Sequence, residues 1–214
     1  MSIPYQYIAI EGNIGSGKTS LCDRLSKSLG YRQILEQFED NPFLPEFYQN
    51  PTRYAFAVEL FFMTERHKQL TSEVSTPSLF QPGIIADYFF LKTLLFAQIN
   101  LDGHEYRLFQ RIFEALSDQL PKPEILIYLH STVPQCLLNI QKRNRSYELE
   151  IQASYLQNIQ NQYLTYLNSV LDFPVLMIEA SGFDFILQPQ LVEQIKEKLM
   201  DTYSKGVHHL KFSL

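Results

Sequence analysis

The sequence predicts an α/β fold of three layers, in which helices cover both faces of a parallel five-stranded sheet. Two observations support this prediction. Short apolar segments alternate with helical segments along most of the chain, which is the pattern typical of a parallel sheet. A glycine-rich turn also joins the first apolar segment to the first helical segment, as in folds that bind ligands beyond the carboxyl ends of their strands.

The strands are predicted from short apolar runs bounded by turn-forming residues. Residues 7–11 run directly into Gly12, and residues 124–129 form the clearest run, between Pro123 and Ser131. The other three strands are expected at residues 33–35, 83–86 and 175–178.

The helices are predicted from the spacing of their apolar residues. In the first, residues 18–29, Leu21, Leu25 and Leu29 recur every four residues, and Gly30 is expected to end it. Residues 41–51 contain three prolines and are expected to be loop or short helix. The remaining helices are expected at 52–70, 88–100, 105–120, 133–141, 151–171 and 190–203, with His208 and His209 in a tail.

Composition excludes several classes of protein. The chain has 214 residues without a linker or an internal repeat, so we expect one domain over residues 1–214. The net charge of −5 argues against a partner that is a nucleic acid polymer. No apolar run reaches the roughly 18 residues that span a bilayer, so no membrane association is expected. Without a signal peptide, Cys22 and Cys136 are expected to be reduced thiols of a cytoplasmic protein.

One segment fits the phosphate-binding pattern G-x-x-x-x-G-K-[ST] at every fixed position. Its glycines let backbone N–H groups surround phosphate oxygens, its lysine adds positive charge, and its threonine hydroxyl reaches Mg²⁺. The segment is Gly12, Asn13, Ile14, Gly15, Ser16, Gly17, Lys18 and Thr19. It predicts ATP and Mg²⁺ as ligands within a P-loop NTPase fold but leaves the phosphate acceptor open.

Neighbouring motifs narrow the class of enzyme. The sequence has neither the N-K-x-D nor the D-x-x-G pattern of GTPases. A motor ATPase would place Asp-Glu after an apolar strand, whereas here Tyr88 follows Asp87. A kinase acting on a small molecule fits better.

Three carboxylates occupy positions where charge is unexpected. Glu36 directly follows the second strand and is either a proton acceptor or a solvated loop charge. Glu59 is the only charge in residues 54–63, which indicates a polar pocket, and Arg66 lies two turns further on the same face and could pair with it. Asp87 ends the third strand and is either a helix cap or a catalytic or Mg²⁺-binding group.

The charged stretch of residues 142–150 joins two predicted helices. It contains Lys142, Arg143, Arg145 and Glu148. It is either a lid that places arginines over the phosphates or an exposed charged face.

Taken in order, these features resemble the deoxynucleoside kinase family over residues 6–185, nearly the whole chain. The resemblance implies that Glu36 contacts the substrate 5′-hydroxyl and serves as the base. It also implies that Tyr48, in the segment Asn41-Pro42-Phe43-Leu44 with Phe47-Tyr48, holds the sugar 3′-hydroxyl. Glu59 stands where the family usually has a base-reading glutamine, and Arg66 matches the arginine seven residues beyond it.

The resemblance extends to the nucleotide side of the site. Asp87 stands at the acidic position of the family's Glu/Asp-Arg-Ser motif, which implies a role in Mg²⁺ binding or proton acceptance. Arg143 and Arg145 resemble the lid arginines that meet the ATP phosphates, and Glu148 resembles the lid glutamate that meets the sugar. Residues 181–185, with Asp184 and Phe185, resemble the loop that holds the adenine of ATP.

The chain departs from the family pattern at two positions. Tyr88 replaces the arginine of the motif, and we include it among the expected substrate-binding residues; Lys92, one helical turn further, could supply the missing charge. Glu59 replaces glutamine, and an ionised carboxylate only accepts hydrogen bonds. It therefore suits a base that presents donors, such as guanine with its N1–H and N2–H₂ groups, and this favours purines.

The resemblance implies ATP-dependent phosphorylation of a small-molecule deoxynucleoside at its 5′-hydroxyl, in nucleotide salvage. It also implies a homodimer, for which the apolar helical segments around residues 56–62 and 89–96 are candidates. Two alternatives stay open, namely a nucleoside-monophosphate kinase and a nucleotide-binding regulatory module without turnover.

Overall fold

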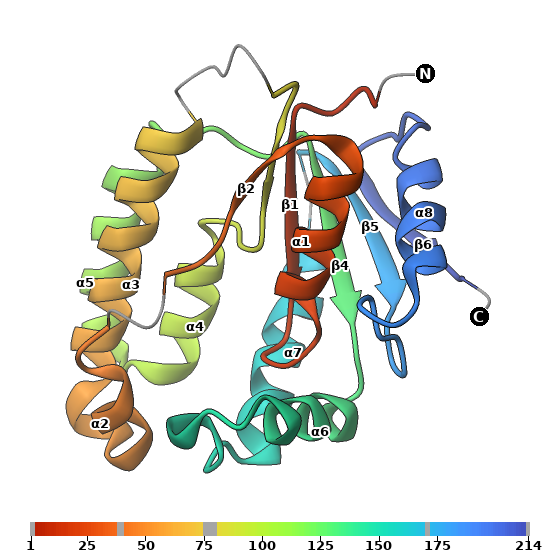
Figure 1. Cartoon of the computed structure of the whole chain (residues 1–214). Coiled ribbons are helices and arrows are strands. Elements are labelled where there is room, and N and C mark those ends of the chain that lie inside the picture. Colours follow the sequence, from red (N-terminus) through yellow and green to blue (C-terminus); the bar gives the residue numbers. More distant parts are fainter. Residues whose placement is uncertain (1–2, 38–40, 75–80, 170–171, 213–214) are drawn as a thin grey trace.

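The computed structural model describes residues 3–37, 41–74, 81–169 and 172–212 of the chain. Within these residues one sheet contains six strands, all parallel, in the order β2-β3-β1-β4-β5-β6 (Figure 1). The strands are β1 (Tyr7–Gly12), β2 (Arg32–Ile34), β3 (Ile84–Ala86), β4 (Ile125–His130), β5 (Pro174–Glu179) and β6 (Gly206–Leu210).

Helices connect the strands and close both faces of the sheet. They are α1 (Lys18–Leu29), α2 (Leu44–Gln49), α3 (Pro51–Val74), α4 (Lys92–Asn100), α5 (Gly103–Ser117), α6 (Val133–Arg143), the 3-10 helix η1 (Ser146–Glu148), α7 (Ala153–Leu167) and α8 (Pro189–Lys198). Helices α1 and α8 pack on one face of the sheet, and α4, α6 and α7 pack on the other. Helices α3 and α5 pack against α4 at one side of the sheet, and α2 packs against α3 (Figure 1). The three-layer α/β prediction is confirmed.

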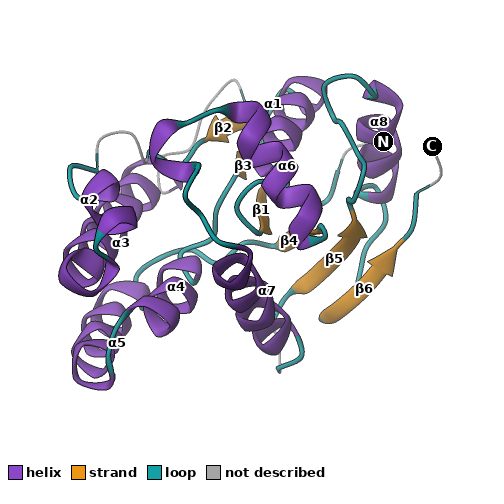
Figure 2. Cartoon of the chain, turned by 90° about the horizontal axis from the view of Figure 1, so that it is seen from below, coloured by secondary structure: helices purple, strands orange, loops and turns teal. Residues whose placement is uncertain are grey.

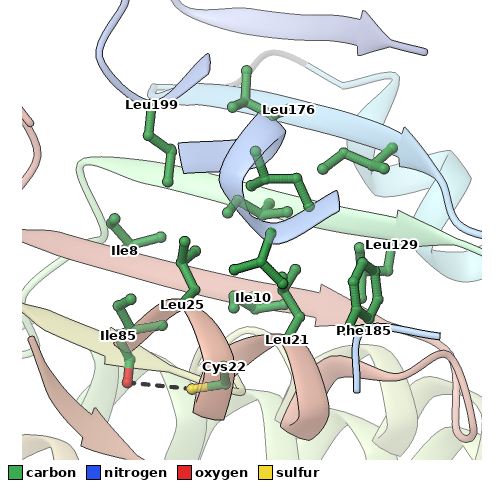
Figure 3. Packing of buried hydrophobic residues seen from close by; sticks show 14 of the residues in the cluster. Ile8, Ile10, Leu21, Cys22, Leu25, Ile85, Leu129, Leu176, Phe185 and Leu199 are labelled. Atoms are coloured by element: carbon green, nitrogen blue, oxygen red, sulfur yellow. Dashed lines mark hydrogen bonds between the residues drawn. The ribbon is translucent and has the colours of Figure 1, made fainter. Parts of the chain in front are cut away.

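The core beneath α1 holds the glycine-rich turn in place. Leu21, Cys22 and Leu25 of α1 are fully buried and face Ile8 and Ile10 of β1 (Figure 3). The Cys22 thiol contacts the Ile85 carbonyl oxygen at 3.6 Å. Both ends of the turn are therefore anchored in the core, and both cysteines are buried free thiols.

The prediction of five strands was wrong by one. Residues 206–210, read from the sequence as a tail, form β6, which pairs in parallel with β5. This strand lies at the sheet edge and has neighbours on one side only, so its residues are mostly half-buried. An edge strand does not need a continuous apolar run. Because His208 and His209 are polar, the sequence did not indicate a strand here.

Several helix boundaries also differ from the prediction. Residues 88–91 form a turn ahead of α4, in which Lys92 N–H donates to the Phe89 carbonyl oxygen at 2.9 Å. Leu91, and not Asp87, occupies the N-cap position of α4, which removes the capping role considered for Asp87. The predicted helix at 151–171 spans Ala153–Leu167, and residues 170 and 171 lie outside the described part of the chain.

The segments that the sequence predicted to be functional lie near the carboxyl ends of the central strands. Viewed from that end, the turn after β1 is surrounded by α2, α4, α6 and α7 (Figure 2). No helix among the described residues has the length and apolar character that crossing a bilayer requires.

Candidate active site

The turn after β1 has the backbone geometry of a phosphate-binding loop. Gly15 has a φ of 78°, and a Cβ there would lie 2.5 Å from the Cys136 carbonyl oxygen, so a side chain is excluded. Gly17, in the left-handed region, precedes α1 without any side-chain cap, which leaves the N–H groups of the first turn open to an anion. The Lys18 ammonium donates to the carbonyl oxygens of Gly12 at 2.9 Å and Asn13 at 2.8 Å.

Two side-chain hydrogen bonds fasten this loop to helices α6 and α7. The Asn13 amide donates to the Leu156 carbonyl oxygen of α7 at 2.8 Å. The Asn139 amide of α6 donates to the Gly15 carbonyl oxygen at 2.7 Å. Residues 144–152, which include most of the predicted lid, connect α6 to α7. The same two helices therefore hold both the phosphate loop and the lid.

Asp87 joins three elements of the site. Its Oδ2 accepts the Thr19 hydroxyl at 2.6 Å, and its Oδ1 accepts the Glu36 backbone N–H at 2.7 Å. Burial and the Glu36 charge raise the pKa of Asp87, against the lowering effect of these hydrogen bonds. The Thr19 and Asp87 oxygens beside the phosphate loop are hard ligands of the kind that Mg²⁺ takes.

Glu36 lies between two cations. Its Oε1 accepts from Arg66 Nε at 2.8 Å and Nη2 at 2.5 Å, and its Oε2 accepts from Lys92 Nζ at 2.5 Å. Burial alone would raise the pKa of Glu36, but the Arg66 and Lys92 charges outweigh it and hold the pKa well below its usual range. The carboxylate is therefore ionised and fixed in position.

Arg66 does not form the expected pair with Glu59. Its guanidinium reaches across to Glu36 and also donates to the Thr93 hydroxyl at 2.8 Å. The spacing along α3 was read correctly, but a carboxylate from another element lies closer. A partner supplied by a different strand could not be found from one helix alone.

Tyr88 lies outside the site, so its expected role in substrate binding is not supported by the geometry. It is fully buried, and its hydroxyl donates to Gln69 Oε1 at 2.7 Å. It is absent from the residues that line the cavity around Glu36 and Glu59. Lys92, by contrast, lines that cavity and contacts Glu36, as its position one turn later suggested.

Glu59 faces the cavity from the middle of α3 and is 2% exposed. Its Oε1 accepts from the Asn100 amide at 2.6 Å. Burial raises its pKa to about 7, while the Asn100 hydrogen bond and the Arg66 and Lys92 charges oppose that rise. The polar pocket that the sequence predicted for Glu59 is present.

The predicted lid lies over the same space. Glu148 accepts a hydrogen bond from Arg143, and Arg145 Nη1 lies 3.5 Å from its Oε1. The Tyr48 ring stacks on Tyr147 with centroids 6.3 Å apart. Burial, followed by the Glu148 charge, raises the pKa of Tyr48, so the two residues expected at the sugar lie close together.

Two hollows meet over the phosphate loop. We call them the acceptor cavity and the donor hollow, after the phosphate acceptor and the ATP that the family resemblance implies for them. The acceptor cavity is lined by Ile14, Gly15, Lys18, Thr19, Glu36, Leu44, Phe47, Tyr48, Val58, Glu59, Phe62, Arg66, Asp87, Lys92, Phe96, Arg143, Arg145, Glu148 and Tyr155. The donor hollow is lined by Gly15, Gly17, Lys18, Thr19, Ser20, Asn139, Lys142, Arg143, Arg145, Phe183, Asp184, Phe185 and Ile186. The two share only residues of the phosphate loop, the start of α1 and the lid arginines.

Asp184 and Phe185, the residues that the resemblance assigned to the adenine of ATP, both line the donor hollow but make different contacts there. Phe185 is buried in the core and lies under Gly17. The Asp184 carboxylate accepts from the N–H groups of Ile186 at 3.0 Å and Leu187 at 3.1 Å. Asp184 thus shapes its own loop, and the half-buried Phe183 adds a ring that the sequence reasoning did not name.

Glu11 is a functional candidate that the sequence reasoning missed. This carboxylate at the end of β1 is 2% exposed and accepts from Phe89 N–H at 2.7 Å and the Tyr163 hydroxyl at 2.8 Å. Burial raises its pKa, and the Lys92 and Lys18 charges oppose the rise. The same argument that singled out Glu59, one charge in an apolar run, would have found it.

The charges of the site act in opposite directions on the pKa of Lys18. Burial and the Lys92 charge lower its pKa to about 8, while Glu11, Glu36 and Asp87 act in the opposite direction. The three carboxylates therefore favour the charged ammonium that a phosphate requires.

Comparison with known proteins gives consistent matches over most of the chain. A family profile described as deoxynucleoside kinase matches residues 8–204. A deoxyguanosine kinase of Bacillus subtilis is 36% identical over 195 residues, covering 88% of this chain and 93% of that protein. A deoxyadenosine kinase of Dictyostelium discoideum is 31% identical, covering 91% and 80%. The structure of a deoxyadenosine kinase from M. mycoides with bound dATP matches with a TM-score of 0.78 at 29% identity, covering 91% of this chain and 99% of that chain.

Proposed function

Because the chain belongs to the deoxynucleoside kinase family, we propose that it transfers the γ-phosphate of ATP to the 5′-hydroxyl of a purine deoxynucleoside. The products are ADP and the deoxynucleoside 5′-monophosphate. One observation carries the proposal: the acceptor cavity places Glu36 beside the Thr19–Asp87 pair, where it meets the donor hollow.

The charges of the cavity favour a nucleoside over a nucleoside monophosphate as the acceptor. An acceptor phosphate would need cations that are free to bind it. Here Arg66 and Lys92 are both paired with Glu36. Glu59 adds a further carboxylate at the same cavity. A hydroxyl group fits this arrangement better than a phosphate dianion.

The base-reading position favours guanine. Asn100 already donates to Glu59, and an ionised carboxylate accepts from donors only. Guanine presents two adjacent donors, N1–H and N2–H₂. Two relatives named as deoxyguanosine kinases are 36% and 31% identical to this chain, and one named as a deoxyadenosine kinase is 31% identical, so these names support a purine.

The proposed mechanism assigns one task to each group. Glu36 orients the 5′-hydroxyl and takes its proton as the oxygen attacks the γ-phosphorus in line. Tyr48 and Glu148 hold the sugar 3′-hydroxyl. Lys18, Arg143 and Arg145 stabilise the charge that develops on the transferring phosphoryl group.

Thr19 and Asp87 are the residues that would hold Mg²⁺, which supplies charge neutralisation at the β- and γ-phosphates when bound. The fit rests on two oxygen ligands that lie 2.6 Å apart beside the phosphate loop.

An Asp87→Asn variant is therefore expected to need about tenfold more Mg²⁺ for half-maximal rate, because an amide oxygen binds the cation more weakly than a carboxylate. The measurement is a Mg²⁺ titration of ADP release at fixed ATP and deoxynucleoside. Asp118→Asn, at the exposed end of α5, is the matched control. An unchanged Mg²⁺ dependence would remove Asp87 from the metal site.

The proposed function is tested by ADP release from ATP·Mg²⁺ with the four deoxynucleosides, their ribonucleoside forms and their monophosphates. We expect turnover with deoxynucleosides, and we expect it to be fastest with deoxyguanosine. Turnover with monophosphates alone would assign the chain to the monophosphate kinases. No turnover, with ATP still bound, would favour a regulatory module.

We also propose a homodimer in a cytoplasmic setting, as the family resemblance implies. Phe90 and Phe96 are buried within the subunit, whereas Phe89 and Leu91 of the same segment are half-buried. Phe56 of α3 is also half-buried, while Phe62 lines the acceptor cavity. Half-buried residues of both segments therefore stay candidates for the interface. Sedimentation velocity gives the oligomeric state directly.

A further inference from the structure

We infer that Asn100 is a specificity-determining residue, whose amide keeps Glu59 a hydrogen-bond acceptor and so favours guanine over adenine. The inference rests on the proposed function, in which Glu59 reads the base. It concerns a side chain at the end of α4, 41 residues from Glu59 along the chain.

The Asn100 amide nitrogen contacts two oxygens. It donates to Glu59 Oε1 at 2.6 Å and to the Tyr155 hydroxyl oxygen at 3.1 Å. Since an amide carries two N–H donors, both are used, and the nitrogen is held facing Glu59. Within the described part of the chain, Asn100 is the hydrogen-bond donor to this carboxylate.

Asn100 lies behind the base-reading group and does not touch the cavity. It is absent from the acceptor-cavity lining, whereas Glu59 and Tyr155 are both part of that lining. It contributes instead to a second groove, which shares Phe47, Tyr48 and Tyr155 with the cavity. Asn100 therefore acts through Glu59 and does not contact the substrate.

The charged and titratable groups around Glu59 come from five elements. Arg66 of α3 and Lys92 of α4 lower its pKa, and Glu36 beyond β2 raises it. Tyr48 of α2 and Tyr155 of α7 are coupled to its charge. Both cations are already paired with Glu36, so the hydrogen bond that holds Glu59 comes from Asn100.

The protonation state decides which base fits. An ionised carboxylate accepts from guanine N1–H and N2–H₂, whereas a protonated carboxyl group offers one donor and one acceptor, which adenine N1 and N6–H₂ match. With the pKa of Glu59 at about 7, the ionised form predominates above that pH and the protonated form below it. Loss of the Asn100 donor raises this pKa and extends the protonated form to higher pH.

The test measures kcat/KM for deoxyguanosine and deoxyadenosine with the full chain, from about pH 6 to about pH 8.5. For the unaltered chain, the ratio of deoxyguanosine to deoxyadenosine is expected to rise about tenfold through neutral pH. In Asn100→Leu, which keeps the side-chain size but has no donor, the midpoint of that rise should move up by about one pH unit. A ratio that does not vary with pH in the unaltered chain overturns the inference without any variant.

Glu59→Gln supplies the matched background, because glutamine does not titrate. Asn100→Leu added to Glu59→Gln should leave the ratio unchanged at every pH. An equal change of the ratio in both backgrounds would show that Asn100 acts by packing and would overturn the inference. Failure of the proposed function gives a different result, since the unaltered chain would then turn over neither purine deoxynucleoside.

Discussion

Glu36→Gln is expected to lower kcat about 1000-fold while the KM for the deoxynucleoside changes by less than about tenfold. The carboxylate lies between Arg66 and Lys92 and beside the Thr19–Asp87 pair, where the proposed mechanism brings the 5′-hydroxyl and the γ-phosphate together. Glutamine keeps the size and can still orient a hydroxyl, but it cannot take a proton. A 1000-fold loss corresponds to about 4 kcal/mol of transition-state stabilisation.

Steady-state ADP release at saturating ATP measures both constants for this variant. Glu114→Gln, an exposed carboxylate on α5, is the matched control and should behave as the unaltered chain. A Glu36→Gln variant that raises KM but keeps kcat would exclude Glu36 as the base. Asp87, whose carboxylate accepts the Glu36 N–H, would then be the group to test.

Lys92→Met is expected to lower kcat about 100-fold. The Lys92 ammonium is 2.5 Å from Glu36 Oε2 and is buried in the acceptor cavity. It provides a positive charge near the place where the family motif has an arginine and this chain has Tyr88. Methionine preserves the apolar stem against Phe96, over which the ammonium lies at 5.4 Å, so the change removes mainly the charge.

Lys92→Arg should retain most of the activity, because arginine restores the charge within reach of Glu36. Lys68→Met, on the exposed face of α3, is the control for loss of a lysine as such. Removing Lys92 leaves a buried carboxylate with one partner fewer, which destabilises the fold, so thermal unfolding is measured alongside. A folded Lys92→Met protein with near-normal kcat would contradict the assignment of this charge.

Much of the site could be predicted from the sequence because its signals are local. The phosphate loop is a contiguous pattern, and the lid is a contiguous run of charges. Glu36 and Asp87 follow strands, and parallel strands bring their carboxyl ends to one edge. The structure places Asp87 against the Thr19 hydroxyl and the Glu36 backbone against Asp87, as that rule requires. Tyr48, Glu59 and Glu148 also line the acceptor cavity.

The errors of the sequence interpretation have specific physical causes. Strand β6 was missed because an edge strand can be half-buried and polar. Tyr88 was placed at the substrate because it occupies a motif position, yet its hydroxyl bonds to Gln69. Glu11 was overlooked although it is a charge at the end of an apolar strand.

The sequence alone predicts the fold class, the position of the phosphate loop and the charged residues of the site, because periodicity and motif spacing are properties of short segments. The tertiary structure decides which charges meet. Glu36 pairs with Arg66 and Lys92, which lie 30 and 56 residues away, and Glu59 takes its donor from the end of α4. Electrostatic energy depends on distance in space and on burial, so neither these pairings nor the pKa directions that follow from them can be read along the chain.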